Sequence, residues 1–246
     1  MKLKLQNISM SFSDKKILSQ ITMNIEEGEF VTILGPSGCG KSTILNILSG
    51  ILHQDEGTVF VDDKEIKDPG EHFAYMPQED LLLPWKTILD NVCLYGILQK
   101  EKKQARAKAL QLLPVFGLEG YENAYPDELS GGMRQRAAFL RTSLSKADIL
   151  LLDEPFAALD VITRNDMQDW LAAMRNSLRK TAVLVTHDID EAIYLSDRIL
   201  ILNGHPASVQ KEITITEKNR TREWLYGQAE LRMQIHGYLK NESELQ

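Results

Sequence analysis

The chain has 246 residues, of which 43% are hydrophobic and 26% charged, as in an ordinary ordered globular protein. Its 35 acidic and 28 basic side chains give a formal charge of −7, which argues against a nucleic-acid coat and a polybasic membrane anchor. Two distant cysteines predict neither a disulfide framework nor a zinc knuckle, and no stretch approaches the roughly 18 apolar residues that span a bilayer.

The first predicted elements are strands. Residues 2–9 alternate apolar and polar side chains in the strand period, and residues 21–34 contain two short strands. The second strand is an apolar run that stops at Gly35, after which residues 41–48 have helical spacing. A glycine-rich turn therefore links a strand to a helix.

That turn carries the motif G-x-x-x-x-G-K-[ST], which binds nucleotide phosphates when it lies between a strand and a helix. Its glycines let backbone N–H groups surround phosphate oxygens, and Lys41 is expected to reach the β and γ phosphates while Ser42 ligates Mg²⁺. The alternative is a glycine turn with a surface lysine, which the strand and helix on either side disfavour. The predicted ATP-binding loop is Gly35, Pro36, Ser37, Gly38, Cys39, Gly40, Lys41, Ser42 and Thr43.

Further along, the pattern changes from sheet to helix and back. A strand is predicted at 57–61, and a mostly helical stretch from about 85 to 145, which includes the helix formers of 100–117, is the only candidate subdomain. Alternating strands and helices resume after it, which predicts a parallel sheet covered by helices. The predicted strands there are 149–152, 182–186 and 199–202, and the predicted amphipathic helix is 163–178.

The strand 149–152 leads directly into two carboxylates, Asp153 and Glu154, an arrangement known as Walker B. Strand alternation sends the two side chains in different directions. Asp153 can then hold the Mg²⁺ shell while Glu154 polarises the attacking water as general base. An acidic pair alone would be a solvated strand end, but the phosphate-binding loop favours the catalytic interpretation.

A second anion-binding turn identifies the family. The run Leu129-Ser130-Gly131-Gly132-Met133 precedes a helical pattern and so predicts another helix N-terminus suited to phosphate. An isolated Ser-Gly-Gly would be an ordinary serine N-cap. Placed shortly before Walker B, it makes the chain resemble the ABC ATPase family, whose signature LSGGQ is matched except for Met133.

The resemblance assigns four further residues in the order that the family shows. It implies adenine stacking on Phe12, a Q-loop at Gln78, a D-loop at Asp160 and a switch histidine at His187. Each is an ordinary core or surface residue when taken alone, so the order and spacing carry the interpretation. Ala157, where the D-loop often has Ser or Gly, departs from the family pattern without removing a phosphate ligand.

The resemblance also implies a fold and an assembly. The fold class is α/β, with a P-loop NTPase core on a mixed or parallel sheet, an N-terminal antiparallel β-subdomain and a helical subdomain insert. Two cassettes pack head to tail as a homodimer, so that the signature and D-loop of one subunit contact ATP bound by the other. The implied residues are Glu154, His187 and Gln78 for catalysis, Ser42, Gln78 and Asp153 for Mg²⁺, and Ser130, Gly131, Gly132 and Asp160 for ATP in trans.

Among ABC proteins, a transporter subunit is favoured over a repair or chromosome ATPase and over a translation factor. The first alternative needs a long coiled coil between phosphate loop and signature, and the second needs another cassette. A non-enzymatic regulator would be expected to lose Glu154 or His187, and both are present. The resemblance therefore implies ATP, Mg²⁺, a separate transmembrane permease, a solute-binding protein as indirect partner, no nucleic acid, and a peripheral position on the cytoplasmic face of the membrane.

Within transporters, the sequences around Gln78, Asp153 and His187 resemble the importer group for nitrate, sulfonate, taurine and pyrimidine precursors. The cargo is chosen by other subunits, so the transported solute stays open. Residues 76–95, which contain Gln78, Leu81 to Leu83 and Trp85, are expected to form part of the groove that receives a short cytoplasmic helix of the permease. The alternative is that Trp85 is buried between the core and the helical insert.

The tail, residues 217–240, has an apolar stripe formed by Trp224, Leu231, Ile235 and Tyr238 at helical spacing. It predicts an amphipathic helix packed on its own cassette, with a dimer contact or a regulatory surface as alternatives. The expected division is a cassette at 1–215 and a C-terminal helical extension at 216–246.

Overall fold

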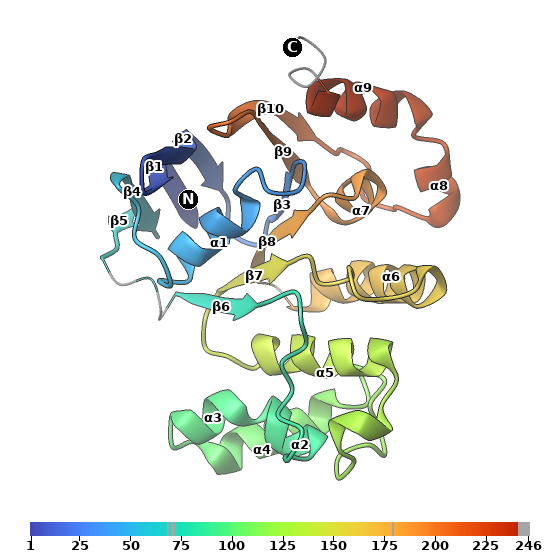
Figure 1. The fold of residues 1–246 in the computed structure, drawn as a ribbon. Helices are drawn as coiled ribbons and strands as arrows, with labels where there is room; N and C mark the ends of the chain where they lie inside the picture. Colours follow the sequence, from blue (N-terminus) through green and yellow to red (C-terminus); the bar gives the residue numbers. More distant parts are fainter. Residues whose placement is uncertain (68, 70–71, 179, 241–246) are drawn as a thin grey trace.

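The computed structural model describes residues 1–67, 69, 72–178 and 180–240 (Figure 1). Its strands are β1 (Leu3–Phe12), β2 (Lys15–Ile25), β3 (Phe30–Leu34), β4 (Glu56–Val61), β5 (Lys64–Glu65), β6 (Phe73–Met76), β7 (Ile149–Asp153), β8 (Thr181–Thr186), β9 (Arg198–Asn203) and β10 (Ser208–Thr214). Its α-helices are α1 (Lys41–Leu48), α2 (Ile88–Val92), α3 (Leu94–Leu98), α4 (Lys102–Leu112), α5 (Gly131–Ser143), α6 (Val161–Leu178), α7 (Ile189–Leu195), α8 (Arg222–Tyr226) and α9 (Ala229–Lys240).

The N-terminal strands form an antiparallel sheet in the order β2-β1-β4-β5. The β2 strand begins at Lys15, six residues before the predicted start, because its first half pairs with the end of β1. After the turn that follows β2, the chain enters the other sheet at β3. The two strands predicted within 21–34 therefore belong to different sheets.

The second sheet has the order β10-β9-β3-β8-β7-β6, and its strands are parallel except β10. Every residue of β3, β7 and β8 is buried, which explains why these strands are continuous apolar runs in the sequence. The predicted α/β fold with a mixed sheet, an antiparallel β-subdomain and a helical insert is confirmed. Because β3, β7 and β8 run in the same direction, the residues that follow them meet at one edge.

Two apolar cores lie on opposite faces of this sheet. Alternate residues of β3 separate between them: Val31 and Ile33 pack with α1 and the antiparallel sheet, and Phe30 and Leu34 pack with the helices of the other face. Each fully buried side chain of this size stabilises the fold by about 1.5–3 kcal/mol. Packing on both faces thus fixes the sheet, including the edge at which β3, β7 and β8 end.

The helices α2 to α5 gather at one end of the molecule, away from the antiparallel sheet (Figure 1). Three aromatic rings join this insert to α6, with centroid distances from Trp170 of 4.9 Å to Phe116 and 5.5 Å to Phe139. The side-chain amide of Gln135 also donates to the Pro155 carbonyl just after Walker B. The insert is therefore packed directly against the segment that follows β7. Across the described ranges, no helix is both long enough and apolar enough to cross a membrane.

The tail differs from the single helix predicted at 217–240. Thr221 caps α8 by accepting a hydrogen bond from the Trp224 N–H at 3.1 Å, and the helix ends at Gly227 before α9 begins. Leu225 and Ile235 are fully buried against the cassette, and Asn203 donates to the Tyr238 carbonyl at 3.0 Å. Both helices therefore pack on their own chain, and the apolar stripe is divided between them. Residues 241–246 lie outside the described part of the chain.

Candidate active site

The phosphate-binding loop connects β3 to α1 as the motif predicts. Gly40 caps the helix with φ of +106°, a conformation that L side chains rarely adopt, and a Cβ there would lie 2.7 Å from Leu18 Cδ2. A cavity of about 290 Å³ opens over this loop. It is lined by Phe12, Ile17, Ser37, Gly38, Gly40, Lys41, Ser42, Thr43 and Glu154.

Lys41 is the buried cation of this loop, with 4% of its surface exposed. Its Nζ donates to the carbonyls of Gly35 and Pro36, both at 2.9 Å. An ammonium group has three donors and no acceptor, so it can exchange these carbonyls for phosphate oxygens. The neighbouring Cys39 is buried, and burial raises the pKa of its thiol. The raised pKa disfavours the thiolate form of Cys39.

Two of the three Mg²⁺ candidates, Ser42 and Asp153, lie next to each other at the edge of the sheet. Ser42 Oγ donates to Asp153 Oδ1 at 3.1 Å, and the Tyr75 hydroxyl donates to Asp153 Oδ2 at 3.0 Å. Burial raises the pKa of the Asp153 carboxyl, and these two hydrogen bonds act in the opposite direction. A hydroxyl beside a carboxylate fits Mg²⁺, which takes one or two protein oxygens in phosphate sites and the rest from phosphate and water. The third candidate, Gln78, is an exposed residue just after β6, the strand that pairs with β7.

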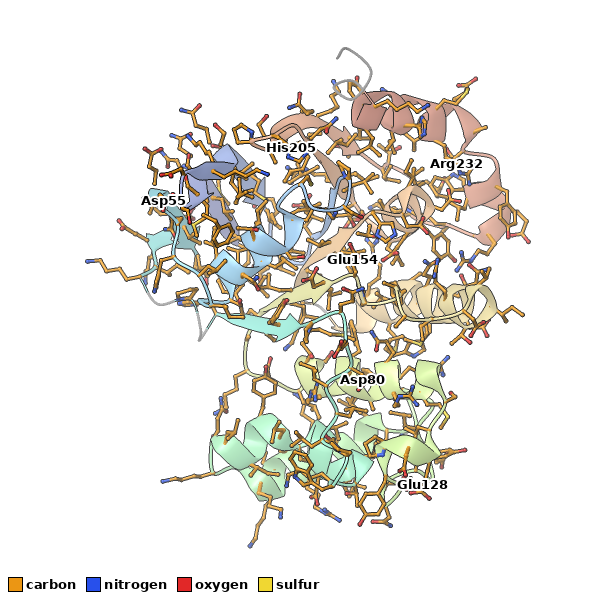
Figure 2. The ribbon with its side chains drawn as sticks, in the orientation of Figure 1. Asp55, Asp80, Glu128, Glu154, His205 and Arg232 are labelled. Atoms are coloured by element: carbon orange, nitrogen blue, oxygen red, sulfur yellow. The ribbon has the colours of Figure 1, made fainter. Side chains whose placement is uncertain are left out.

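The general-base candidate and the switch histidine are in contact. Glu154 Oε2 lies 3.1 Å from His187 Nδ1, because β7 and β8 are adjacent parallel strands and both residues follow their ends. Glu154 has φ of +43° and its N–H donates to the Val185 carbonyl at 2.9 Å, so the backbone after β7 is strained and held by β8. Figure 2 shows Glu154 near the middle of the molecule.

The signature turn and the D-loop form a second group. Ser130 Oγ accepts from the Met133 N–H at 3.3 Å and caps α5, and Asp160 accepts from the Thr163 N–H at 3.1 Å at the start of α6. Hydrogen bonds from Thr163, from both its hydroxyl and its N–H, are the main cause of the lowered pKa of Asp160. Within the described residues, the lining of the Lys41 cavity includes neither group. In one chain, the signature turn and the D-loop are therefore separate from the predicted phosphate-binding loop.

Gly132 holds the signature turn close to the D-loop helix. A Cβ at Gly132 would lie 2.7 Å from Thr163 Cγ2, whereas one at the adjacent Gly131 would lie 3.5 Å from Leu159 Cδ2, an ordinary contact. We expect Gly132→Ala to destabilise the fold by about 1–3 kcal/mol through overpacking. Gly131→Ala is the matched control and should not destabilise it. Chemical denaturation of both variants measures this difference, and equal stabilities would contradict the close packing.

Two residues that touch the site were missed from the sequence. Tyr75 is a strand residue of β6, and only its three-dimensional position beside Asp153 shows its role. Ile17 lies in the part of β2 that the sequence pattern did not predict, and it joins Phe12 on the wall of the Lys41 cavity. Their only sequence signal is their place in strands next to known motifs.

Comparison with known proteins agrees with this geometry. Residues 18–157 match the protein family described as ABC transporter. The chain is 41% identical over 245 residues to the formylaminopyrimidine import ATP-binding protein ThiZ of Halalkalibacterium halodurans, covering 97% of this chain and 96% of that protein. It is 40% identical over 217 residues to the aliphatic sulfonates import ATP-binding protein SsuB of Bacillus cereus, covering 87% and 86%. The ATP-binding cassette MJ0796, in a dimeric post-hydrolysis state bound to ADP and Pi, has a TM-score of 0.74 at 33% identity, covering 87% of this chain and 99% of that one.

Proposed function

This chain belongs to the ABC transporter family, and we propose that its ATP hydrolysis energises uptake of a small solute through a separate transmembrane permease. The solute classes that its relatives' names support are sulfonates and pyrimidine precursors, with nitrate and taurine as similar small substrates. As an ABC cassette, the chain binds and hydrolyses ATP. The observation that carries the proposal is the contact of Glu154 with His187 beside the Lys41 cavity.

The residues of this chain divide the work of phosphoryl transfer. The Phe12 ring would stack on adenine, and Lys41 with the N–H groups of its loop would hold the β and γ phosphates. Ser42 and Asp153, with Gln78, would hold Mg²⁺, which neutralises charge on the phosphates when bound. Glu154 accepts a proton from water, and His187 keeps that carboxylate and the γ-phosphate aligned. Catalysis is then positioning and electrostatics rather than covalent chemistry.

A second copy of the chain supplies the other half of the site. Ser130, Gly131, Gly132 and Asp160 are proposed to contact ATP held by the partner's phosphate loop. Val161 and Ile162, directly after Asp160, are 69% and 75% exposed, an apolar pair that a subunit contact would cover. The dimeric state of the related cassette with ADP and Pi supports the participation of a second copy.

An uptake experiment tests the proposed function. Cells that lack this chain should lose import of one of four solutes: an alkanesulfonate, taurine, nitrate or formylaminopyrimidine. The wild-type chain should restore import, and Glu154→Gln should not, because uptake depends on hydrolysis. Unchanged import of all four solutes would contradict the proposed solute classes.

We propose that the permease docks on the segment after Gln78. Leu81 and Trp85 are 55% and 71% exposed, whereas Leu82 is buried and fixes the segment to the core. Arg141 of α5 donates to the Leu81 carbonyl at 2.7 Å, and Arg134 pairs with Asp80 at 3.1 Å, so this surface is tied to the signature helix. Figure 2 shows Asp80 on the strand-to-helix connection between the core and the insert.

The docking surface predicts uncoupling. The double variant Leu81→Asp, Trp85→Ala should keep the ATPase rate of the isolated subunit and lose most solute uptake with the permease. Met233→Ala, which removes another exposed apolar side chain from α9, is the matched control and should change neither rate. Uptake and phosphate release are measured on the same vesicles. Normal uptake by the double variant would exclude this docking role.

The remaining assignments concern the boundaries and location of the subunit. The cassette is proposed to comprise residues 1–215, with the helical subdomain at approximately 85–145, and the extension residues 216–246. A peripheral position on the cytoplasmic face of the membrane follows from the need for cellular ATP and for permease contact. Fractionation with the permease expressed and omitted measures this location.

A further inference from the structure

A small polar cavity of about 50 Å³ adjoins the switch histidine. It is lined by Glu154, Phe156, Ala157, Arg164, Thr186, His187, Asp188 and Glu191. These residues come from the segment after β7, from the end of β8 and the turn that follows it, and from the first turns of α6 and α7. The cavity therefore lies where the base, the D-loop helix and the histidine turn meet, and its volume has room for one water molecule.

Glu191 braces the turn that carries His187. Its side chain is 4% exposed, and its Oε2 accepts a hydrogen bond from Thr186 Oγ1 at 3.1 Å. Thr186 Oγ1 in turn accepts from the Asp188 N–H at 3.0 Å, and Asp188 Oδ1 accepts from the Glu191 N–H at 3.1 Å. The bonds form a closed ring around the residue between Thr186 and Asp188. Glu191 is therefore linked to the residues on both sides of His187.

Arg164 connects the same cavity to the D-loop. Its Nη2 donates to the Leu159 carbonyl at 3.0 Å, and its N–H donates to the Asp160 carbonyl at 2.8 Å. Two buried atoms, Arg164 Nε and Glu191 Oε1, have no hydrogen-bond partner among the described protein atoms. A buried polar atom without a hydrogen-bond partner destabilises the fold. Two such atoms on one small cavity therefore point to a contact between them that is bridged by the water molecule for which the cavity has room.

We propose that Glu191 and Arg164 are positioning residues that share this cavity. Together they fix the position of the His187 turn relative to the D-loop. The proposal rests on the proposed function, since it concerns when the His187 and Glu154 pair is aligned for hydrolysis. The D-loop is the segment assigned to contact the partner subunit. Binding of the partner subunit to the D-loop would then change the position of His187 through Arg164 and Glu191.

The charge state of Glu191 fits this role. Burial raises its pKa to about 8, and nearby Asp188 and Glu154 act in the same direction, while Thr186 and Arg164 act against it. The carboxyl is therefore mostly protonated at neutral pH and can donate into the cavity while still accepting from Thr186. Glutamine has the same shape and the same pair of functions, an accepting oxygen and a donating nitrogen.

Substitution of Glu191 tests its positioning role, with glutamine as the conservative rescue. Glu191→Ala should lower kcat for ATP hydrolysis by about 10- to 100-fold, because a misplaced catalytic group costs rate without affecting the phosphate loop. The KM for ATP should stay within about twofold. Glu191→Gln should retain most of the wild-type kcat. A folded Glu191→Ala chain with wild-type kcat, or a Glu191→Gln chain as slow as Glu191→Ala, would overturn the proposal.

If Glu191→Ala does not fold, a second variant tests the same connection. Thr186→Val preserves side-chain shape and removes only the hydroxyl that joins Glu191 to the Asp188 N–H, so it should lower kcat in the same way. Combined with Glu191→Ala it should add little further loss, since both remove one connection. Additive losses would contradict a shared role.

The failure of this proposal can be told apart from failure of the proposed function. In the Glu154→Gln background, Glu191→Ala should still bind ATP and dimerise, because only alignment for hydrolysis is affected. If Glu154→Gln alone hydrolysed ATP at the wild-type rate, the assignment of the base would be wrong. If that variant is inactive while Glu191→Ala is fully active, only the positioning role fails.

Discussion

Replacing Lys41 and Glu154 separately should give two different defects. Lys41→Ala is expected to weaken ATP binding by about 10- to 150-fold, because one charged hydrogen-bonding partner of the phosphates is lost. Glu154→Gln should bind ATP normally and lower kcat by about 10²–10⁴-fold, the range that a general base supplies. The nucleotide-bound dimer should then accumulate, since hydrolysis no longer separates the subunits. Calorimetry measures the ATP affinity, phosphate release measures kcat, and light scattering measures the accumulation of the dimer.

Matched controls separate these defects from a general loss of charge. Lys64→Ala and Glu230→Gln change exposed residues of β5 and α9, outside the proposed site, and should leave ATP affinity and kcat unchanged. Wild-type hydrolysis by Glu154→Gln would refute the general-base role. Wild-type ATP affinity in Lys41→Ala would refute the role of the phosphate loop.

Local features were the ones that the sequence predicted well. The run from β3 through Gly40 to α1 is contiguous, so its motif and flanking periodicity defined both the fold and the chemistry. Strands buried on both faces, such as β7 and β8, are also visible as continuous apolar runs. By contrast, β10 is a largely exposed edge strand with a polar composition, and it was missed because it lacks such a run.

Features that depend on long-range pairing needed the structure. The 3.1 Å contact of Glu154 with His187 was expected only through family resemblance, and it exists because β7 and β8 are neighbours. Tyr75 reaches Asp153 through the pairing of β6 with β7, which no local pattern encodes. The exposed residues of the segment expected to form the groove also differ from the prediction, because Leu82 is buried whereas Leu81 and Trp85 are exposed.

We propose that each ATP site is shared between two copies of this chain. Lys41→Ala removes the phosphate-binding lysine from one half of the site, and Ser130→Arg blocks the signature turn of the other half. Each variant alone should be inactive, because both sites of its homodimer are defective. A heterodimer of the two variants keeps one intact site, formed by Lys41 of one subunit and Ser130 of the other.

Phosphate release after subunit mixing tests this claim most directly. In a random equal mixture, half of the dimers are heterodimers, and each heterodimer carries one intact site out of two. We therefore expect roughly a quarter of the wild-type rate of phosphate release. Native mass spectrometry of the same mixture establishes that heterodimers form. A mixture that contains heterodimers but hydrolyses ATP no faster than the separate variants would contradict the shared site.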